Sequence, residues 1–327
     1  MSTEFATGQI SLTDAAQAVK QVKDNISRVL VGQDAIIEDV LTVLFAGGHV
    51  LLEGVPGLGK TLLVRALAKS LSVSFSRVQF TPDLMPSDVV GHSMYDMKSG
   101  DFNIKKGPAF TNILLADEIN RAPAKTQSAL LEVMQEQQIT IDGETLSIDS
   151  PFMVLATQNP LDQEGTYPLP EAELDRFMMK IELGFPSLEA EVELLKLNTK
   201  VVSNESEVSQ LPAVLSVSNI AQIKQLCADI LVDEKIYNYA VELVRSSRTW
   251  QGVLHGAGLR ASINIIKAAK VMALMNGRDF VIPDDVKLVV PNILRHRLIL
   301  SADLELEGVS FNEVISAILA SVEAPRS

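Results

Sequence analysis

Cysteine is almost absent from this chain of 327 residues, which contains a single one, Cys227. One thiol cannot form an internal disulfide or a zinc site built from several cysteines. Because Cys227 lies among apolar residues at helical spacing, we expect a buried structural thiol. The four histidines show no metal-ligand spacing, and we assign them no metal: they are His49, His92, His255 and His296.

Long apolar runs and an excess of basic residues are also missing. No window approaches the ~20 apolar residues that a membrane-spanning helix needs, and the first residues do not form a signal peptide. The 28 Lys and Arg are outnumbered by 41 Asp and Glu, which gives a net charge of −13. Since nucleic-acid binding draws on clustered cations, this balance disfavours DNA or RNA as a partner. We expect a soluble, cytoplasmic protein.

The overall composition is that of a folded protein, with 47% hydrophobic and 21% charged residues. Chains of this length rarely fold around a single hydrophobic core, so we expect two domains. In the first part of the chain, strand and helix alternate, and the strands are continuous apolar runs that suit a parallel sheet buried on both faces. This pattern predicts an α/β domain with strands at 49–52, 78–80, 113–115 and 153–156 and helices at 35–45 and 60–71.

Two segments interrupt the alternation, and both are predicted to be hairpins. Residues 95–105 alternate loosely about Lys98-Ser99-Gly100. Residues 138–148 alternate more cleanly about Asp142-Gly143, a strong two-residue turn sequence. We expect both hairpins to be insertions on the α/β core.

After Pro186 the apolar residues follow the helical period. The sequence predicts helices at 188–197, 218–244, 261–275 and 284–294, with a polar loop at 201–210. We therefore divide the chain into an α/β domain at 1–186 and an all-helical domain at 187–327.

Residues Gly54 to Thr61 fit the phosphate-binding pattern G-x-x-x-x-G-K-[ST] in full. A predicted strand precedes the pattern and a predicted helix follows it, as phosphate binding requires. The glycines let backbone N–H groups surround a phosphate at a helix N-terminus. Lys60 supplies a charge for the β- and γ-phosphates, and the Thr61 hydroxyl can bind Mg²⁺. A glycine turn with a solvated lysine is the alternative.

The strand at 113–115 runs into Asp117 and Glu118, and the strand at 153–156 into Asn159. The carboxyl ends of parallel strands face the ligand crevice, so these side chains should meet beside the phosphate loop. Asp117 would hold Mg²⁺ through water, and Glu118 would polarise the attacking water. Asn159 is a candidate phosphate sensor, with a simple Asn-Pro turn as the alternative.

Three arginines are further candidates. Arg176 follows Asp175 before a strand-like segment, and Arg260 opens the helix at 261–275. A cation at a helix N-terminus opposes the helix dipole, so a phosphate or a carboxylate should compensate Arg260. Arg121 could face a neighbouring subunit or be solvated.

These motifs, in this order, resemble those of AAA+ ATPases, and the surrounding sequence resembles the MoxR family over roughly residues 30 to 300. The matching segments are 48–54, 79–88, 117–122, 156–160, 164–172 and 294–298. The resemblance implies an αβα core with a parallel sheet, hairpin insertions and a smaller all-α lid. One departure is visible: Gly258-Leu259 stands where the family usually has Ser-Pro before Arg260, which loosens the turn that directs Arg260.

The resemblance also implies site residues. Asp117 and Glu118 would form Walker B, Asn159 sensor 1, Arg176 the arginine finger and Arg260 sensor 2. Mg²⁺ would be held by Thr61 and Asp117. The residues expected to bind ATP are Val31, Gly32, Gln33, Gly54, Val55, Pro56, Gly57, Leu58, Gly59, Lys60, Thr61 and Leu62.

The function that the resemblance implies is ATP hydrolysis in a homo-oligomeric ring, a hexamer, coupled to remodelling or activation of a partner protein. In such families the partner is often a von Willebrand factor A protein, and some members aid metal or cofactor insertion. The alternatives are a nucleic-acid-dependent helicase or translocase and a nucleotide-gated scaffold with negligible turnover. The acidic balance counts against the first, and Glu118 counts against the second.

Overall fold

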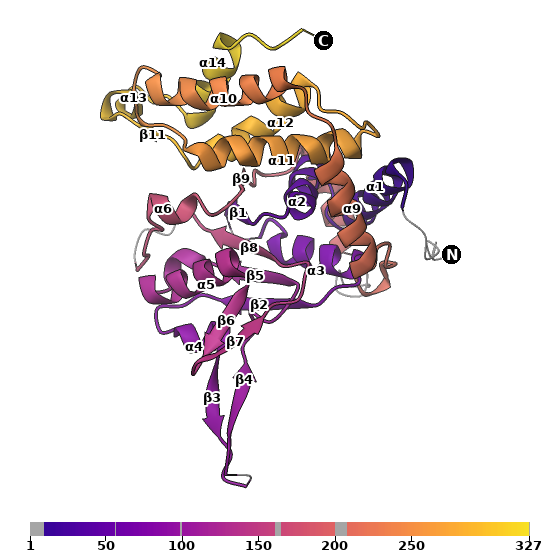
Figure 1. Cartoon of the computed structure of the whole chain (residues 1–327), viewed down its shortest axis with the longest axis vertical. Helices are drawn as coiled ribbons and strands as arrows, with labels where there is room; N and C mark the ends of the chain where they lie inside the picture. The colour runs from indigo at the N-terminus through magenta and orange to yellow at the C-terminus, as the bar shows by residue number, and fades with distance from the viewer. Residues whose placement is uncertain (1–9, 56, 99, 161–164, 200–207, 327) are drawn as a thin grey trace.

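The computed structural model describes residues 10–55, 57–98, 100–160, 165–199 and 208–326. A sheet with helices on both faces lies beneath a layer of further helices, and a long hairpin projects from the opposite end (Figure 1). The loop predicted at 201–210 falls largely outside the described residues.

Five parallel strands form the central sheet in the order β2-β5-β8-β1-β9. The strands are β1 (Val50–Glu53), β2 (Phe75–Gln79), β5 (Ile113–Asp117), β8 (Met153–Gln158) and β9 (Met179–Glu182). The predicted strands are present, and the strand-like segment expected after Arg176 is β9, which forms the edge beside β1. In this order β1 is flanked by β8 and β9, so the segment that leaves β1 lies beside the end of β8.

Alternate residues of the strands enter two separate cores, because successive side chains point to opposite faces. Leu52, Leu115 and Leu155 belong to the core under the first helices, and Leu51 and Leu114 belong to the core on the other face. The inner strands β1, β5 and β8 are buried on both faces, which explains their continuous apolar sequences. The α/β class is confirmed.

The helices of this part are α1 (Leu12–Val29), α2 (Asp34–Ala46), α3 (Lys60–Ser70), α4 (Pro86–Val90), α5 (Ala124–Glu136) and α6 (Glu171–Leu174), with a 3-10 turn at Ile119–Arg121. We did not predict α1, although the sequence carries its start: the Ser11 hydroxyl accepts the Asp14 N–H. Its apolar face, which includes Val19, Val22 and Ile26, is fully buried.

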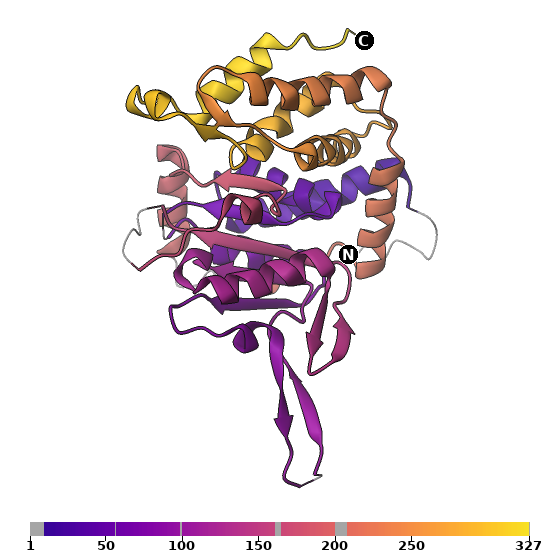
Figure 2. The ribbon, with the colours of Figure 1, turned by 60° about the vertical axis from the view of Figure 1, so that its left-hand side comes forward.

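The two hairpins are present, and they project from the same end of the molecule (Figure 2). β6 (Gln138–Ile141) and β7 (Glu144–Ser147) turn at Asp142 and Gly143, as predicted. β3 (Gly91–Tyr95) and β4 (Phe102–Lys106) form the longer hairpin. Our prediction placed its first strand too late: the strand ends, rather than begins, at Tyr95, because Gly91 is the bend that leaves α4.

The C-terminal part is helical. Its elements are α7 (Leu188–Asn198), α9 (Val217–Asp229), α10 (Glu234–Thr249), α11 (Leu259–Met275), α12 (Pro283–Leu294), α13 (Ala302–Leu306), α14 (Phe311–Ser321) and the short strands β10 (Val253–His255) and β11 (Ile299–Leu300). The continuous helix predicted at 218–244 is wrong. It breaks after Asp229, where Leu231 bridges to Phe280 and the Asp233 carboxylate caps the next helix.

The helical lid shares its core with the α/β part. α11 packs on α1 and α2, and the Thr42 hydroxyl lies 3.4 Å from the Met272 sulfur. One continuous cluster of buried apolar side chains runs from the sheet through these helices into α12 and α14. Cys227 is buried in that cluster, as predicted, and burial raises the pKa of its thiol to about 12.

Candidate nucleotide-binding site

The segment between β1 and α3 is shaped by two close approaches of the backbone. Gly59 has φ of +82° and caps α3, and a Cβ there would lie 2.7 Å from the Leu30 side chain. A Cβ on Gly54 would lie 2.9 Å from the Leu183 carbonyl oxygen. Gly57, at φ of +90°, has open space around it. The loop therefore wraps an open space at the N-terminus of α3, where N–H groups favour an anion. Pro56 lies outside the described residues.

Lys60 is the first residue of α3 and turns back over this loop. Its ammonium donates to the carbonyl oxygens of Gly54, at 2.5 Å, and Gln158, at 3.4 Å. Burial lowers its pKa, while the nearby carboxylates of Asp117, Glu118 and Glu53 oppose that shift. The ammonium is thus held by two neutral acceptors that a phosphate can replace.

Asp117 and Glu118 lie at the carboxyl end of β5, and Thr157 of β8 fixes them relative to each other. The Thr157 hydroxyl accepts the Glu118 N–H at 2.8 Å and donates to Asp117 Oδ1 at 2.7 Å. Thr157 is fully buried. Glu118 adopts a left-handed conformation, with φ of +56°. The sheet geometry therefore brings the two acids to one place, as the sequence predicts.

Two residues of β2 complete this edge, and sequence analysis missed them. Arg77 binds Asp117 Oδ2 through Nη2 at 2.7 Å and Nε at 3.2 Å. The Gln79 amide donates to Glu118 Oε2 at 2.8 Å, and Arg121 reaches the same oxygen at 3.2 Å. Arg77 and Gln79 are two residues apart in β2 and therefore point to the same face of the strand. This spacing was the sequence signal that could have indicated their role. Arg121 thus faces Glu118 within its own chain.

Two adjoining cavities lie on either side of the phosphate loop. One of about 530 Å³ is lined by Gly57, Gly59, Lys60, Thr61, Leu62, Arg65, Arg77, Gln79, Asp117, Glu118, Thr157 and Asn159. The other, of about 600 Å³, is lined by Val29, Leu30, Val31, Gln33, Gly57, Leu58, Gly59, Leu62, Phe185, Pro186, Glu191, Leu194 and Leu195. The first is rich in charge and the second is mostly apolar, so together they suit a phosphate chain and a base.

The remaining predicted residues of the loop region lie close by. Gln33 donates to the Leu58 carbonyl at 3.1 Å and so links α2 to the phosphate loop. Gly32 faces α7, where a Cβ would lie 2.5 Å from the Ala190 Cβ. Gly54 and Val55 connect β1 to the loop. Eight of the predicted nucleotide-binding residues line the two cavities, and Gly32, Gly54 and Val55 do not; the eight are Val31, Gln33, Gly57, Leu58, Gly59, Lys60, Thr61 and Leu62.

The comparisons with known proteins agree with this geometry. The family profile of the ATPase family associated with various cellular activities (AAA) matches residues 49–179, and that of the AAA lid domain matches residues 246–318. The chain is 44% identical over 312 residues to the chaperone MoxR1 of Mycobacterium tuberculosis, covering 92% of this chain and 81% of the relative. The chain belongs to the MoxR family of AAA ATPases.

Two further relatives extend the match of this MoxR-family ATPase along the chain. It is 45% identical over 302 residues to the uncharacterized protein YeaC of Bacillus subtilis, covering 92% of this chain and 93% of that one. A crystal structure from Cytophaga hutchinsonii, described as a candidate ATPase, superposes with a TM-score of 0.88 at 44% identity and covers 96% of this chain and 97% of the other. The helical lid is thus confirmed together with the core, and among the described residues no helix is long and apolar enough to cross a membrane.

The structure of this MoxR-family ATPase does not bring Arg176 or Arg260 into the phosphate cavity. Arg176 is half-buried and donates to the Leu131 carbonyl of α5 at 2.9 Å. Arg260 forms an ion pair of 3.0 Å with Asp175. A carboxylate, rather than a phosphate, therefore compensates Arg260 here, and the roles of both arginines stay predictions.

Two of the four histidines, His49 and His296, are buried and hydrogen-bonded to the backbone. His49 accepts the Val154 N–H through Nδ1 and donates to the Met134 carbonyl through Nε2, and burial lowers its pKa to about 4. His296 donates to the Phe177 carbonyl, and burial holds its pKa well below the ordinary value. Within the described ranges no cluster of three or more His, Cys, Asp or Glu side chains could hold a metal ion.

Proposed function

We propose that this MoxR-family ATPase binds Mg²⁺ and ATP at the two cavities and couples hydrolysis to the remodelling or activation of a partner protein. The observation that supports the proposal is the convergence of Lys60, Asp117, Glu118 and Asn159 on one cavity. These residues come from three separate elements, and they are of the types that phosphoryl-transfer chemistry uses beside the phosphates.

Binding is divided between the cavities. The apolar cavity beside Val31, Gln33 and Leu62 suits adenine, and the loop from Gly54 to Gly59 suits the phosphates. The Lys60 ammonium would exchange its two carbonyl partners for the β- and γ-phosphates. Thr61 and Asp117 supply oxygen ligands of the kind that Mg²⁺ prefers. When bound there, the ion would neutralise charge on the phosphates.

In hydrolysis, Glu118 would polarise the attacking water as a general base, and Asn159 would contact the γ-phosphate or that water. The Thr157 hydrogen bonds keep Glu118 in register with Asp117. Because the Gln79 amide already occupies Glu118 Oε2, the other carboxylate oxygen or a rotation of the side chain would serve the water.

We further propose a homo-hexameric ring in which Arg176 completes the site of a neighbouring subunit. Arg176 lies outside its own phosphate cavity, as a residue that acts on a neighbour must. Each subunit of the ring would consist of the nucleotide-binding part, 1–186, and the lid, 187–327. Arg260 of the lid would act as the sensor of nucleotide state.

The proposed client is a protein, with a von Willebrand factor A domain as the first candidate, and the proposed location is the cytoplasm. Three relatives carry the name MoxR or MoxR1, and one of them is described as a chaperone. A Glu118→Gln variant, which should hold ATP without turnover, is the reagent for capturing the client. Measuring ATPase activity with and without DNA tests the nucleic-acid motor.

Two substitutions separate binding from hydrolysis. Lys60→Ala should abolish nucleotide affinity because the phosphates lose the loop cation. Glu118→Gln should keep that affinity and lower kcat by about 10²-fold or more, since water activation is removed. Lys69→Ala, an exposed position of the same helix, is the matched control and should change neither. Equal loss of affinity in the first two variants would contradict the assigned roles.

Mixed rings test the neighbour's contribution. Arg176→Ala subunits keep the phosphate loop, and Lys60→Ala subunits keep the arginine. Each alone should be nearly inactive, because arginine fingers contribute about 10³–10⁵ in rate. Mixing should restore part of the activity, whereas no recovery despite subunit exchange would contradict a contribution across the interface.

A further inference from the structure

The segment 294–298, Leu-Arg-His-Arg-Leu, matches the family sequence, but the nucleotide site does not use it. In the structure it follows α12 and meets the chain around Arg176. Its second arginine, Arg297, has a side chain that is only 2% exposed. A buried guanidinium is costly unless its donors are satisfied, so its partners indicate what it holds.

Arg297 uses five N–H groups, and four of its hydrogen bonds go to one short stretch of backbone and side chain. Nε binds Asp175 Oδ1 at 2.6 Å. Nη2 donates to the carbonyl oxygens of Asp175, at 3.1 Å, and Phe177, at 2.6 Å, while Nη1 donates to that of Met178 at 3.2 Å. The fifth bond goes to the Ile293 carbonyl in the last turn of α12. His296 donates to the Phe177 carbonyl as well, at 3.0 Å.

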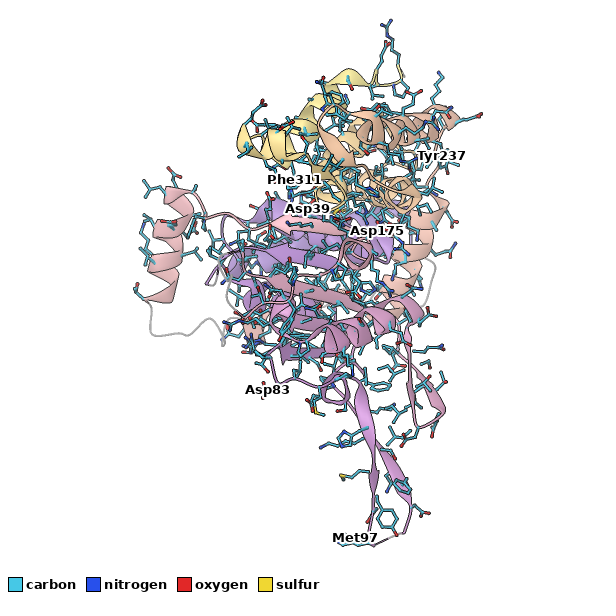
Figure 3. All side chains as sticks on the ribbon, turned by 90° about the vertical axis from the view of Figure 1, so that its left-hand side faces the viewer. Asp39, Asp83, Met97, Asp175, Tyr237 and Phe311 are labelled. Carbon is cyan, nitrogen blue, oxygen red and sulfur yellow. The ribbon has the colours of Figure 1, made fainter. Side chains whose placement is uncertain are left out.

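These bonds fix the main chain on both sides of Arg176. Phe177 is fully buried against the sheet, so the segment is held from one side by the core and from the other by the lid. Arg260 of α11 binds the second oxygen of Asp175. Figure 3 shows Asp175 at the level where the lid meets the α/β part. Two lid arginines thus share the carboxylate that precedes the proposed finger.

We propose that Arg297 is a positioning residue for Arg176, through which the lid of each subunit sets the place of the arginine that it offers to its neighbour. The inference rests on the proposed function of Arg176. It assigns Arg297 an effect on the neighbouring subunit's hydrolysis, although Arg297 itself contacts only its own chain.

A lysine cannot replace this arginine. Its three donors on one nitrogen cannot reach a carboxylate and three carbonyls at once, whereas the planar fork can. Arg297→Lys keeps the charge near Asp175 but frees the backbone at Phe177 and Met178. A displacement of about 1 Å in a catalytic group can cost about 10² in rate.

Arg295 is the matched control, because it stands two residues earlier and joins the same parts of the molecule. Its guanidinium contacts the Lys180 carbonyl, Glu182, Asn292 and Asn312. None of these contacts lies in residues 175–178. Arg295→Lys should therefore disturb the lid interface without releasing Arg176.

The test places Arg297→Lys on either side of the active interface in the mixed rings described above. In the first mixture, donor subunits carry Lys60→Ala with Arg297→Lys and acceptors carry Arg176→Ala. In the second, donors carry Lys60→Ala alone and acceptors carry Arg176→Ala with Arg297→Lys. The total set of substitutions is the same, so a general defect in folding or assembly affects both mixtures.

We expect the recovered ATPase rate of the first mixture to fall at least about ten-fold below that of the parent pair, and that of the second to stay within about two-fold. When Arg295→Lys replaces Arg297→Lys, the recovered ATPase rate should fall in neither mixture. Equal rates in both mixtures, whether high or low, would overturn the positioning role. If the parent pair does not recover while subunits exchange, the finger role of Arg176 fails, and the inference fails with it for that separate reason.

Discussion

At the scale of single residues, the catalytic edge depends on one small side chain that carries no charge. Thr157 is fully buried and satisfies both the Glu118 N–H and Asp117 Oδ1. A hydroxyl can accept and donate at once, which is why one side chain can hold both the Glu118 main chain and the Asp117 carboxylate.

Thr157→Val keeps the shape of this side chain and removes both bonds. We expect the free energy of unfolding to fall by about 1–3 kcal/mol, because a buried N–H loses its acceptor. We also expect kcat to fall by about ten-fold or more, since Glu118 is no longer aligned with Asp117. Thr140→Val, on the exposed β6–β7 hairpin, is the control. Urea unfolding and steady-state kinetics check both, and unchanged kcat would show that the alignment does not matter.

Protonation of His49 should appear in the pH dependence of stability. Both ring nitrogens are bonded in the neutral form, and the folded-state pKa is about 4 against an ordinary 6.5. A histidine whose pKa is lowered contributes stability that is present above pH 6.5 and lost as the pH falls toward 4. Asp39 acts in the opposite direction, because burial raises its pKa to about 7.

A difference measurement separates the two groups. Glutamine can offer one donor and one acceptor as neutral histidine does, so His49→Gln should gain about 2 kcal/mol in unfolding free energy relative to the parent between pH 7 and pH 5. Asp39 is common to both proteins and cancels. Equal pH profiles for His49→Gln and the parent would mean that His49 can charge without unfolding.

The site was predictable where its signal was local. The loop from Gly54 to Thr61 carries its spacing in eight consecutive residues, and Asp117 and Glu118 end an apolar run. The roles of Arg77 and Gln79 were not predicted because they depend on β2 lying next to β5. The partners of Arg297 were not predictable from local sequence, because Asp175 lies 122 residues away along the chain.

At the scale of elements, the sequence predicted strands better than the joints between helices. Residues 218–244 have an unbroken helical period, and the break after Asp229 is made by distant contacts with residues near Phe280. The β6–β7 hairpin was clear because Asp142 and Gly143 both adopt positive φ, which few other residue pairs tolerate.

Gly143→Ala tests that turn. Gly143 has φ of +86° and no atom within 4 Å of an added Cβ, so backbone strain is the only penalty. We expect hydrogen exchange of β6 and β7 to speed up, corresponding to about 1 kcal/mol of local stability. Gly184→Ala, with equal space and no positive φ, should leave that exchange unchanged. Identical exchange in the two variants would contradict the strain argument.

At the scale of the whole molecule, the two functional parts share one core. Apolar side chains of the sheet, of α1 and α2, and of α11 and α12 form a single cluster. A fragment ending at residue 186 would expose the lid-facing sides of α1 and α2. We expect such a fragment to aggregate and the full chain to unfold in one transition.

The single tryptophan makes this measurable. Trp250 lies in the lid and its fluorescence reports that part, whereas hydrogen exchange of β5 and β8 reports the sheet. Both should lose structure at the same denaturant concentration. Two separate midpoints would contradict a common core.

The shared layer also restricts how the lid can move. A hinge rotation of the lid about the segment near Pro186 would separate α11 from α2 and expose the buried faces of both helices to water. Packed helices that stay in contact move instead by shear, with shifts of about 1–2 Å. Met272 and Met275 lie at this contact beside Thr42, and their unbranched side chains adapt to such shifts at low cost. We therefore expect the movement of the lid to be limited by how far the Met272 and Met275 side chains can adapt, and not by the length of the segment near Pro186.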